Sequence, residues 1–262
     1  MAGPGHTPVA TPCEGHSMHA QIVLFDGFDP LDALAPYEVL SAGSTFTCGA
    51  VTVELVTAEG PREVVSGVGG LSLPATAALD PARADLVVVP GAAGRIGEPG
   101  EVPEEPAGHA EDSPGQSTAG DGAAADGGHG GELIPVLLAR ALTTELPGLL
   151  KAAMERRETT MATVCGGSVL LAMAGLLEGR HATTHHRGMD LLDASGVHAV
   201  RARVVDDGDL VTGAGVTSGL DLGLHLLERW MGPRIAHAVE ELFEHERRGI
   251  VWRAEGPVPA QP

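Results

Sequence analysis

One cysteine stands at a position from which a chain can present a nucleophile. Residues 159–164 are β-branched or apolar enough for a buried strand, and residues 168–174 are typical of a helix of Ala, Leu and Met. Cys165 lies at the join, followed by Gly166 and Gly167. This layout is typical of a nucleophile elbow, a sharp strand-to-helix turn that lifts one side chain above the sheet. Free N–H groups and the partial positive charge at the helix N-terminus favour a thiolate, the reactive form of cysteine.

The alternative for Cys165 is a buried, inert thiol at a strand end, which is the commoner role of a lone cysteine. The two glycines and the following helix favour the nucleophile. Asp32 is a second candidate, in the first turn of a helix predicted over residues 31–42, close to the end of the first strand. Alone, it is equally explained as an acid that interacts favourably with the helix dipole.

A further loop follows the strand predicted over residues 84–91. In an open parallel sheet, the loops at the carboxyl ends of the strands form the binding crevice. The backbone N–H groups of Gly91 and Ala92 could therefore contribute to an oxyanion hole.

Histidines near Cys165 raise the question of a metal. His181 to His186 is predicted as a short strand running into a loop, with His181 and His185 on one face. No second cysteine or ordered carboxylate cluster accompanies them, so we favour His185 as a polar partner of Cys165 over a metal ligand. His237, Glu241 and His245 align on the last predicted helix, 235–248, where a solvated face is favoured over a metal site.

The remaining elements alternate between strands and helices. Further strands are predicted over 21–25, 51–57 and 200–205 and from 210, with a hairpin or a bent strand over 64–73. Further helices are predicted over 133–142, 145–157, 189–194 and 220–231. This order implies a mostly parallel sheet with helices on both faces.

Composition sets the boundaries of the domain and excludes some partners. The 262 residues are 43% hydrophobic and carry a net charge of −19, so we expect no binding to nucleic acid or to anionic membranes. We predict a disordered tail over 1–18, a domain over 19–253 and a tail over 254–262. Residues 97–131, rich in Gly, Pro and acids, are predicted to be a disordered surface insertion within that domain.

The three cysteines, Cys13, Cys48 and Cys165, show no CxxC spacing. We therefore expect no disulfide framework and no zinc knuckle, and a reducing cytoplasm as the setting. The sequence has no run of 18 apolar residues and no signal-peptide pattern at its N-terminus.

Several segments together resemble the DJ-1/PfpI superfamily, which has the class I glutamine-amidotransferase-like fold. Within it, they resemble the branch of isonitrile hydratases and AraC-type regulator N-domains. The segments that carry the resemblance are 23–32, 36–39, 88–91, 163–165, 170–172, 175–180, 182–185 and 214–221. The resemblance implies an α/β three-layer sandwich with a mostly parallel central sheet, of flavodoxin-like type, and a homodimer.

The resemblance also implies roles for single residues. Cys165 matches the family nucleophile, Asp32 matches the acidic residue that faces it, and His185 matches the His that often lies near it. Three positions depart from the pattern: Gly166 replaces a Thr common in hydratases, Ala92 replaces a second loop glycine, and Gly213 replaces a frequent Ser. The missing Thr hydroxyl removes one group that could orient substrate or water.

Three functions follow as hypotheses. The first is a cofactor-independent lyase that adds water to an isonitrile to give an N-substituted formamide, with Cys165, Asp32 and His185 at its centre. The second is a glyoxalase- or deglycase-like hydrolase of small carbonyl compounds. The third is a non-enzymatic redox or ligand sensor; the AraC-type relatives carry a DNA-binding domain after this one, whereas this chain ends soon after its last predicted helix.

Overall fold

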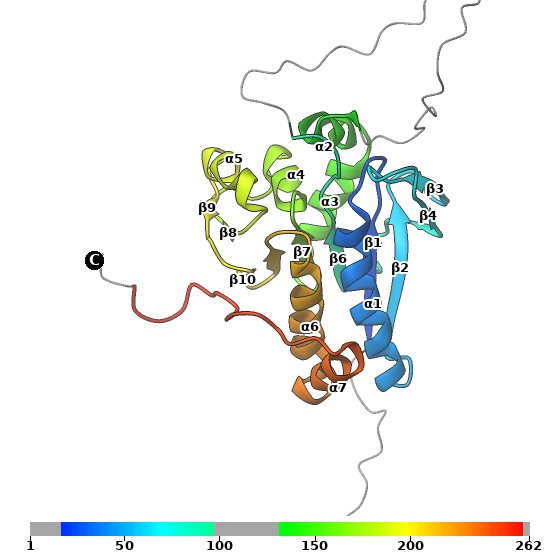
Figure 1. Ribbon diagram of the computed structural model, residues 1–262, viewed down its shortest axis with the longest axis vertical. Helices are drawn as coiled ribbons and strands as arrows, with labels where there is room; N and C mark the ends of the chain where they lie inside the picture. The colour runs from blue at the N-terminus through cyan, green and yellow to red at the C-terminus, as the bar shows by residue number, and fades with distance from the viewer. Residues whose placement is uncertain (1–16, 97–130, 259–262) are drawn as a thin grey trace, which may run out of the picture.

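Short runs of Val, Ile, Leu, Ala and Thr build the central sheet of the computed structural model, which describes residues 17–96 and 131–258. Its seven strands stand in the order β10-β11-β7-β6-β1-β2-β5 (Figure 1), and only the β10–β11 pair is antiparallel. These strands are β1 (Met18–Val23), β2 (Val51–Thr57), β5 (Ala77–Ala78), β6 (Leu86–Val89), β7 (Thr160–Val164), β10 (Val204–Asp206) and β11 (Leu210–Gly213).

The three central strands bring the predicted site residues to one edge of the sheet. Val88 in β6 pairs with Ile22 in β1 and with Ala162 in β7, so these parallel strands end at the same level. Every residue of β6 and β7 is buried, as expected for strands that are covered on both faces. The loops that follow β1, β6 and β7 therefore meet above the sheet.

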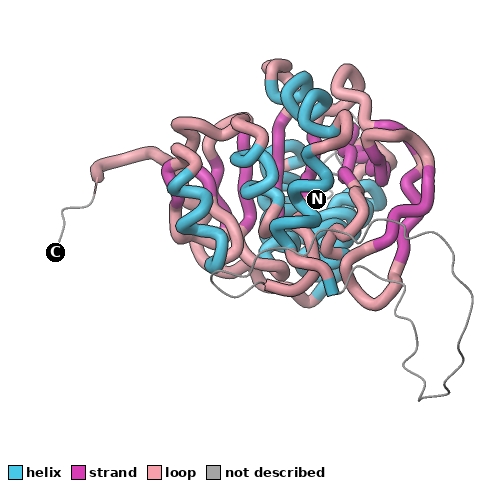
Figure 2. Tube along the Cα trace, turned by 90° about the horizontal axis from the view of Figure 1, so that it is seen from above, coloured by secondary structure: helices cyan, strands magenta, loops and turns pink. Residues whose placement is uncertain are grey.

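Two groups of helices flank the sheet (Figures 1 and 2). In the first group, α1 (Pro30–Phe46), α6 (Ser218–Met231) and α7 (Pro233–Phe243) pack against one another. In the second group, α2 (Ile134–Leu142) packs against α3 (Leu146–Met154) and α4 (Gly167–Met173). The short α5 (Met189–Ala194) packs beside α4. The predicted three-layer α/β fold with a mostly parallel sheet is confirmed.

Smaller elements lie outside the main sheet. β3 (Arg62–Val65) and β4 (Ser72–Ala75) form the predicted hairpin, and β8 (His181–Ala182) pairs with β9 (His198–Ala199), with the 3-10 turn η2 (His186–Gly188) between them. The strand predicted over 181–186 is shorter because the Thr183 N–H donates to the Thr212 side chain instead of a neighbouring strand.

Two other predicted boundaries are wrong. The last helix ends at Phe243 rather than residue 248, because Glu244 takes the left-handed conformation with φ 48°. The strand predicted over 200–205 is β10, which begins at Val204. Among the described residues no helix is long and apolar enough to cross a bilayer.

The predicted tails and insertion fall largely outside the described residues, which exclude 1–16, 97–130 and 259–262. Met18, placed in the predicted N-terminal tail, instead begins β1 and is buried. Cys48 is disulfide-bonded, which corrects the expectation that no disulfide is present. Cysteine pairing depends on which segments meet in space, so the spacing of cysteines did not reveal it.

Candidate active site

Cys165 forms a strained turn between β7 and α4, as the elbow pattern predicts. Its φ is 54°, in the left-handed region that costs a non-glycine residue about 1–2 kcal/mol. The side chain is only 9% exposed, and its thiol is free. Backbone strain at this one residue turns the chain sharply from the sheet into the helix.

Glycines let the neighbouring loop approach the elbow closely. A Cβ on Gly167 would lie 2.2 Å from the Val89 carbonyl oxygen, and a Cβ on Gly91 would lie 2.6 Å from the Gly166 nitrogen. Both distances are far shorter than a carbon atom tolerates. The loop after β6 and the start of α4 therefore touch backbone to backbone, and position 91 has no room for a side chain.

Asp32 reaches the elbow from the first turn of α1. This helix begins where Asp29 accepts a hydrogen bond from the Leu31 N–H at 2.9 Å, with Pro30 at its first position. Asp32 is fully buried, and its Oδ2 accepts a hydrogen bond from the Gly91 N–H at 3.0 Å. Its side chain and the Cys165 side chain are close enough to shift each other's pKa, and Oδ1 has no hydrogen-bond partner among the described residues.

Burial holds a proton on this carboxyl group. The pKa of Asp32 is raised well above its ordinary value, first by burial and then by the nearby charge of Asp29. The hydrogen bonds from Gly91 and with Cys165 lower this pKa without reversing the shift. Asp32 is thus suited to donate a proton.

The Cys165 thiol also keeps its proton in the resting site. Burial raises its pKa most, and the Asp32 carboxyl raises it further, whereas a hydrogen bond from the Gly166 backbone N–H lowers it. The expectation that the helix N-terminus leaves a ready thiolate is therefore corrected, because burial outweighs the helix. A thiol and a carboxyl group in contact form one unit that shares its protons.

The backbone donors predicted for an oxyanion hole have separate partners. The Gly91 N–H is occupied by Asp32, so its role in this structure is to hold the carboxyl group. The Gly166 N–H faces the Cys165 sulfur. Ala92 is buried in the same loop, and a Cβ on Gly166 would lie 3.8 Å from its nitrogen. The oxyanion role of Gly166 and Ala92 stays a prediction.

His185 follows Thr184, which contacts the Cys165 carbonyl group, but no hydrogen bond joins His185 to Cys165 or Asp32 in the described structure. Its Nδ1 accepts from the Arg187 N–H at 3.4 Å, and its ring lies 3.3 Å from the position of a Cβ on Gly215. Burial and the charges of His186 and Arg187 lower its pKa, so it is neutral at pH 7. Its role as a partner of Cys165 stays a prediction.

Hydroxyl groups beneath the elbow were not anticipated from the sequence. Thr184 Oγ1 donates to the Cys165 carbonyl oxygen at 2.6 Å. Ser168 Oγ donates to the Thr183 carbonyl oxygen at 2.7 Å and meets Thr163 Oγ1 at 2.5 Å. All of these side chains are buried. The signal that could have found them is the presence of hydroxyl residues in otherwise buried, apolar segments.

The histidines considered as metal ligands lie apart. His237 contacts Glu240 and Glu241 on α7, whereas His245 faces Asp221 at 3.6 Å. Within residues 17–96 and 131–258, no group of three or more His, Cys, Asp or Glu side chains is placed to hold a metal ion.

Comparisons with known proteins identify a family domain around Cys165. Residues 130–229 match the DJ-1/PfpI family. An isonitrile hydratase from Pseudomonas putida is 44% identical over 85 residues, which cover 32% of this chain and 37% of that protein. The HTH-type transcriptional regulator CdhR from Pseudomonas aeruginosa is 34% identical over 125 residues, 44% of this chain and 37% of the regulator. The matches thus span little more than a third of these relatives.

Solved structures extend the likeness to the segments that carry Asp32 and Gly91. A ThiJ/PfpI family protein from Pseudomonas syringae has a TM-score of 0.65 at 24% identity, covering 95% of this chain and 84% of that one. Drosophila melanogaster DJ-1beta has a TM-score of 0.63 at 17% identity, covering 87% and 98%. At these identities the likeness concerns the fold. Residues 130–229 are therefore similar to the DJ-1/PfpI family, and the chain has the fold of the DJ-1 and ThiJ/PfpI proteins.

Proposed function

We propose that this domain is a cysteine-dependent hydratase of a small electrophile, converting an isonitrile and water into an N-substituted formamide. The observation that carries the proposal is a free Cys165 thiol at its elbow that interacts with the buried Asp32, whose Oδ1 has no hydrogen-bond partner among the described residues. A soft nucleophile beside a protonated acid is what addition to a terminal isonitrile carbon requires.

The proposed reaction uses the shared protons of this pair. The Cys165 sulfur bonds to the terminal carbon of R–N≡C, and the thiol proton arrives on the same carbon through Asp32, giving the thioimidate R–N=CH–S–Cys. Water then adds across the C=N bond, its oxygen to carbon and one proton to nitrogen. The C–S bond breaks, the hydroxyl proton returns to sulfur, and R–NH–CHO leaves. No metal or organic cofactor enters these steps.

Two further observations support an isonitrile. The 44% identity to the P. putida hydratase is the first. The second is the small exposed fraction of Cys165, which favours a slender group such as a terminal isonitrile carbon over a bulky substrate.

The test is formamide production from cyclohexyl isocyanide by wild type, Cys165→Ala and Asp32→Ala. We expect turnover in the wild type and its loss in both variants, by at least about 100-fold. Full turnover by Cys165→Ala would overturn the mechanism. If the wild type makes no formamide but converts methylglyoxal to lactate, the carbonyl hydrolase described above replaces it.

Gly166 offers a sharper test, since the resemblance places Thr at this position in hydratases. A Cβ on Gly166 would meet Gly91 Cα at 3.4 Å, an ordinary contact, so a side chain fits. We expect Gly166→Thr to fold and to raise formamide turnover several-fold, while Gly166→Ala does not. Equal turnover in all three proteins would show that the hydroxyl has no part in the reaction.

A second candidate is a ligand-sensing domain, favoured by the 34% identity to the regulator CdhR. It predicts that an isonitrile or another small molecule binds without turnover and that Cys165→Ala still binds it. A redox sensor is less favoured, because the raised pKa of the thiol slows its reaction with peroxide. Intact mass after mild peroxide treatment would show whether Cys165 gains oxygen.

A further inference from the structure

The carbonyl group of the nucleophile has a partner from a distant segment. Thr184, 19 residues after Cys165, donates its hydroxyl to the Cys165 carbonyl oxygen at 2.6 Å, and the Thr184 side chain is 1% exposed. The same segment is fixed independently, because the Thr183 N–H donates to Thr212 Oγ1 at 2.8 Å. Thr184 therefore approaches the elbow from a rigid base.

The carbonyl group of Cys165 and the N–H group of Gly166 belong to one peptide unit. In a planar trans peptide these two groups point in opposite directions. Thr184 holds the carbonyl on one side, and the Gly166 N–H faces the Cys165 sulfur on the other. Any rotation of this peptide that broke the Thr184 hydrogen bond would also turn the N–H away from the sulfur.

Gly166 makes such a rotation easy. A glycine has no Cβ, so the peptide that precedes it is less restricted than it would be before any other residue. Gly166 also has helical dihedral angles, φ −67° and ψ −7°, and a Cβ added to it would make only ordinary van der Waals contacts. The restraint on the peptide must therefore come from another residue.

We infer that Thr184 is a positioning residue, whose hydroxyl fixes the Cys165–Gly166 peptide so that the Gly166 N–H faces the sulfur and the negative charge that it carries as a thiolate. This inference rests on the proposed function for its effect on turnover, but not for its effect on the thiol itself. A donor fixed in advance is worth more in catalysis than one that must rotate into place. A hydrogen bond to the carbonyl also strengthens the N–H of the same peptide as a donor.

The experiment compares Thr184→Val with Thr184→Ser, which keeps the hydroxyl. Thr183→Val is the matched control, because Thr183 is equally buried but donates to the Ala202 carbonyl oxygen at 3.0 Å, not to the elbow. Two quantities are measured: kcat for formamide production, and the rate of Cys165 alkylation by iodoacetamide as a function of pH.

We expect Thr184→Val to lower kcat about tenfold or more with a smaller change in KM. At pH 8 its alkylation should slow about fivefold, the factor that one hydrogen bond to the thiolate is worth. Thr184→Ser should restore both quantities, and Thr183→Val should change neither, although it loses similar thermal stability. The carboxyl groups that act on the thiol, those of Asp32 and Asp29, are the same in all four proteins.

Wild-type alkylation rates in Thr184→Val would overturn the inference, as would equal losses in Thr184→Val and Thr183→Val. If Thr184→Val does not fold, Thr184→Ala replaces it, with the same expected results. Alkylation needs no isonitrile turnover. A wild type that makes no formamide but shows the expected alkylation pattern would therefore refute the proposed function and leave the role of Thr184 intact.

Discussion

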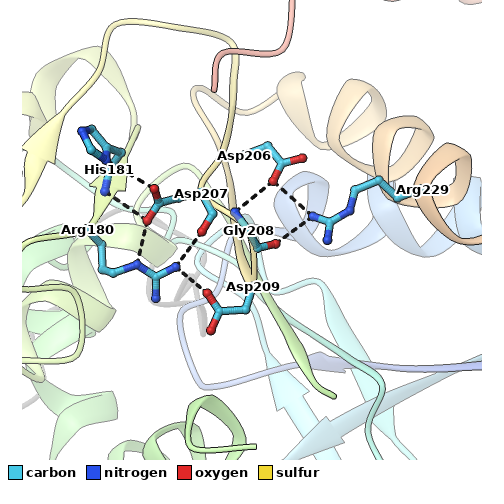
Figure 3. A network of polar contacts seen from close by, with 7 residues as sticks. All are labelled: Arg180, His181, Asp206, Asp207, Gly208, Asp209 and Arg229. Atoms are coloured by element: carbon cyan, nitrogen blue, oxygen red, sulfur yellow. Dashed lines mark hydrogen bonds and ion pairs between the residues drawn. The ribbon is translucent and has the colours of Figure 1, made fainter. Parts of the chain in front are cut away.

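Two buried aspartates differ in the number and charge of the hydrogen-bond donors that surround them. Asp32, at the elbow, and Asp206, at the turn between β10 and β11, are 0% and 7% exposed. Asp32 accepts a hydrogen bond from one donor among the described residues, the Gly91 N–H, and its Oδ1 has no partner there. Asp206 is surrounded by donors, several of them positively charged, and part of its network is drawn in Figure 3.

Both oxygens of Asp206 are occupied. Oδ1 accepts from the Gly208 N–H at 3.1 Å and from Arg229 at 3.2 Å, as Figure 3 shows. Oδ2 accepts from His225 at 2.8 Å and from Arg253 at 3.1 Å. Burial alone would raise the pKa of Asp206, but His225 and then Arg229 lower it, with the result at about 2.

Asp32 and Asp206 show that burial and hydrogen-bonding partners have separate effects on the pKa of a carboxyl group. Desolvation raises the pKa of both carboxyl groups, and at Asp206 the charged and hydrogen-bonding partners reverse the direction of the shift. Asp206 is a charged residue that ties β10 to α6 and to the segment around Arg253. Asp32 keeps its proton, and its Oδ1 has no hydrogen-bond partner among the described residues. This combination is expected of a residue that contributes little to the stability of the fold and takes part in the reaction.

The largest contrast is expected in stability. Asp206→Asn removes the charge that faces His225 and two arginines, and should lower the free energy of unfolding by about 3 kcal/mol. Asp32→Asn removes a carboxyl group that is costly to ionise, so at pH 7 the free energy of unfolding should stay the same or rise. Urea denaturation of both variants measures this, and equal losses would show that the two aspartates have the same role.

A smaller contrast is expected between two glycines of the site. Gly91→Ala places a Cβ 2.6 Å from the Gly166 nitrogen and 2.9 Å from Asp32 Oδ2, so it must displace the loop from the elbow. We expect a loss of about 2 kcal/mol in stability and of most formamide turnover. Gly166→Ala, with its ordinary 3.4 Å contact, should keep its stability within about 0.5 kcal/mol. Similar melting temperatures for both variants would contradict the observed packing.

The smallest effect is the acid dependence of Asp206. Its folded-state pKa is depressed, so its contribution to stability is present above the unfolded-state pKa and is lost as the pH falls from about 5 toward 2. With a shift from 3.8 to about 2, this contribution is about 2 kcal/mol. Asp206→Asn should flatten the stability curve of the wild type in this range. An unchanged acid slope would place the depressed carboxyl group elsewhere.

Parts of this site followed from the sequence because they depend on local patterns. An apolar strand, a cysteine, two glycines and a helix placed Cys165 at an elbow, and the alternation of strands and helices gave the parallel sheet. The role of Asp32 required the family resemblance, since a helix-start acid 133 residues before the cysteine carries no sign of its partner.

Other parts depend on which segments meet in space. The hydrogen bond from Thr184 to Cys165 and the one from Gly91 to Asp32 join residues far apart in the chain, so no local pattern indicates them. The raised pKa of the thiol follows from burial, which the helix argument did not weigh. Figure 3 shows the same limit at Asp206, whose partner Arg229 lies on α6 and was not predicted.

The most direct test of the paired thiol and carboxyl group is formamide turnover by Asp32→Asn, with iodoacetamide alkylation of Cys165 measured in the same preparation. An asparagine can still donate a hydrogen bond to sulfur but cannot pass a proton to the isonitrile carbon. The account predicts a variant whose Cys165 is still alkylated and whose kcat/KM is at least about 100-fold lower than that of the wild type. Turnover at the wild-type rate would contradict it, because the proton would then come from a group other than Asp32.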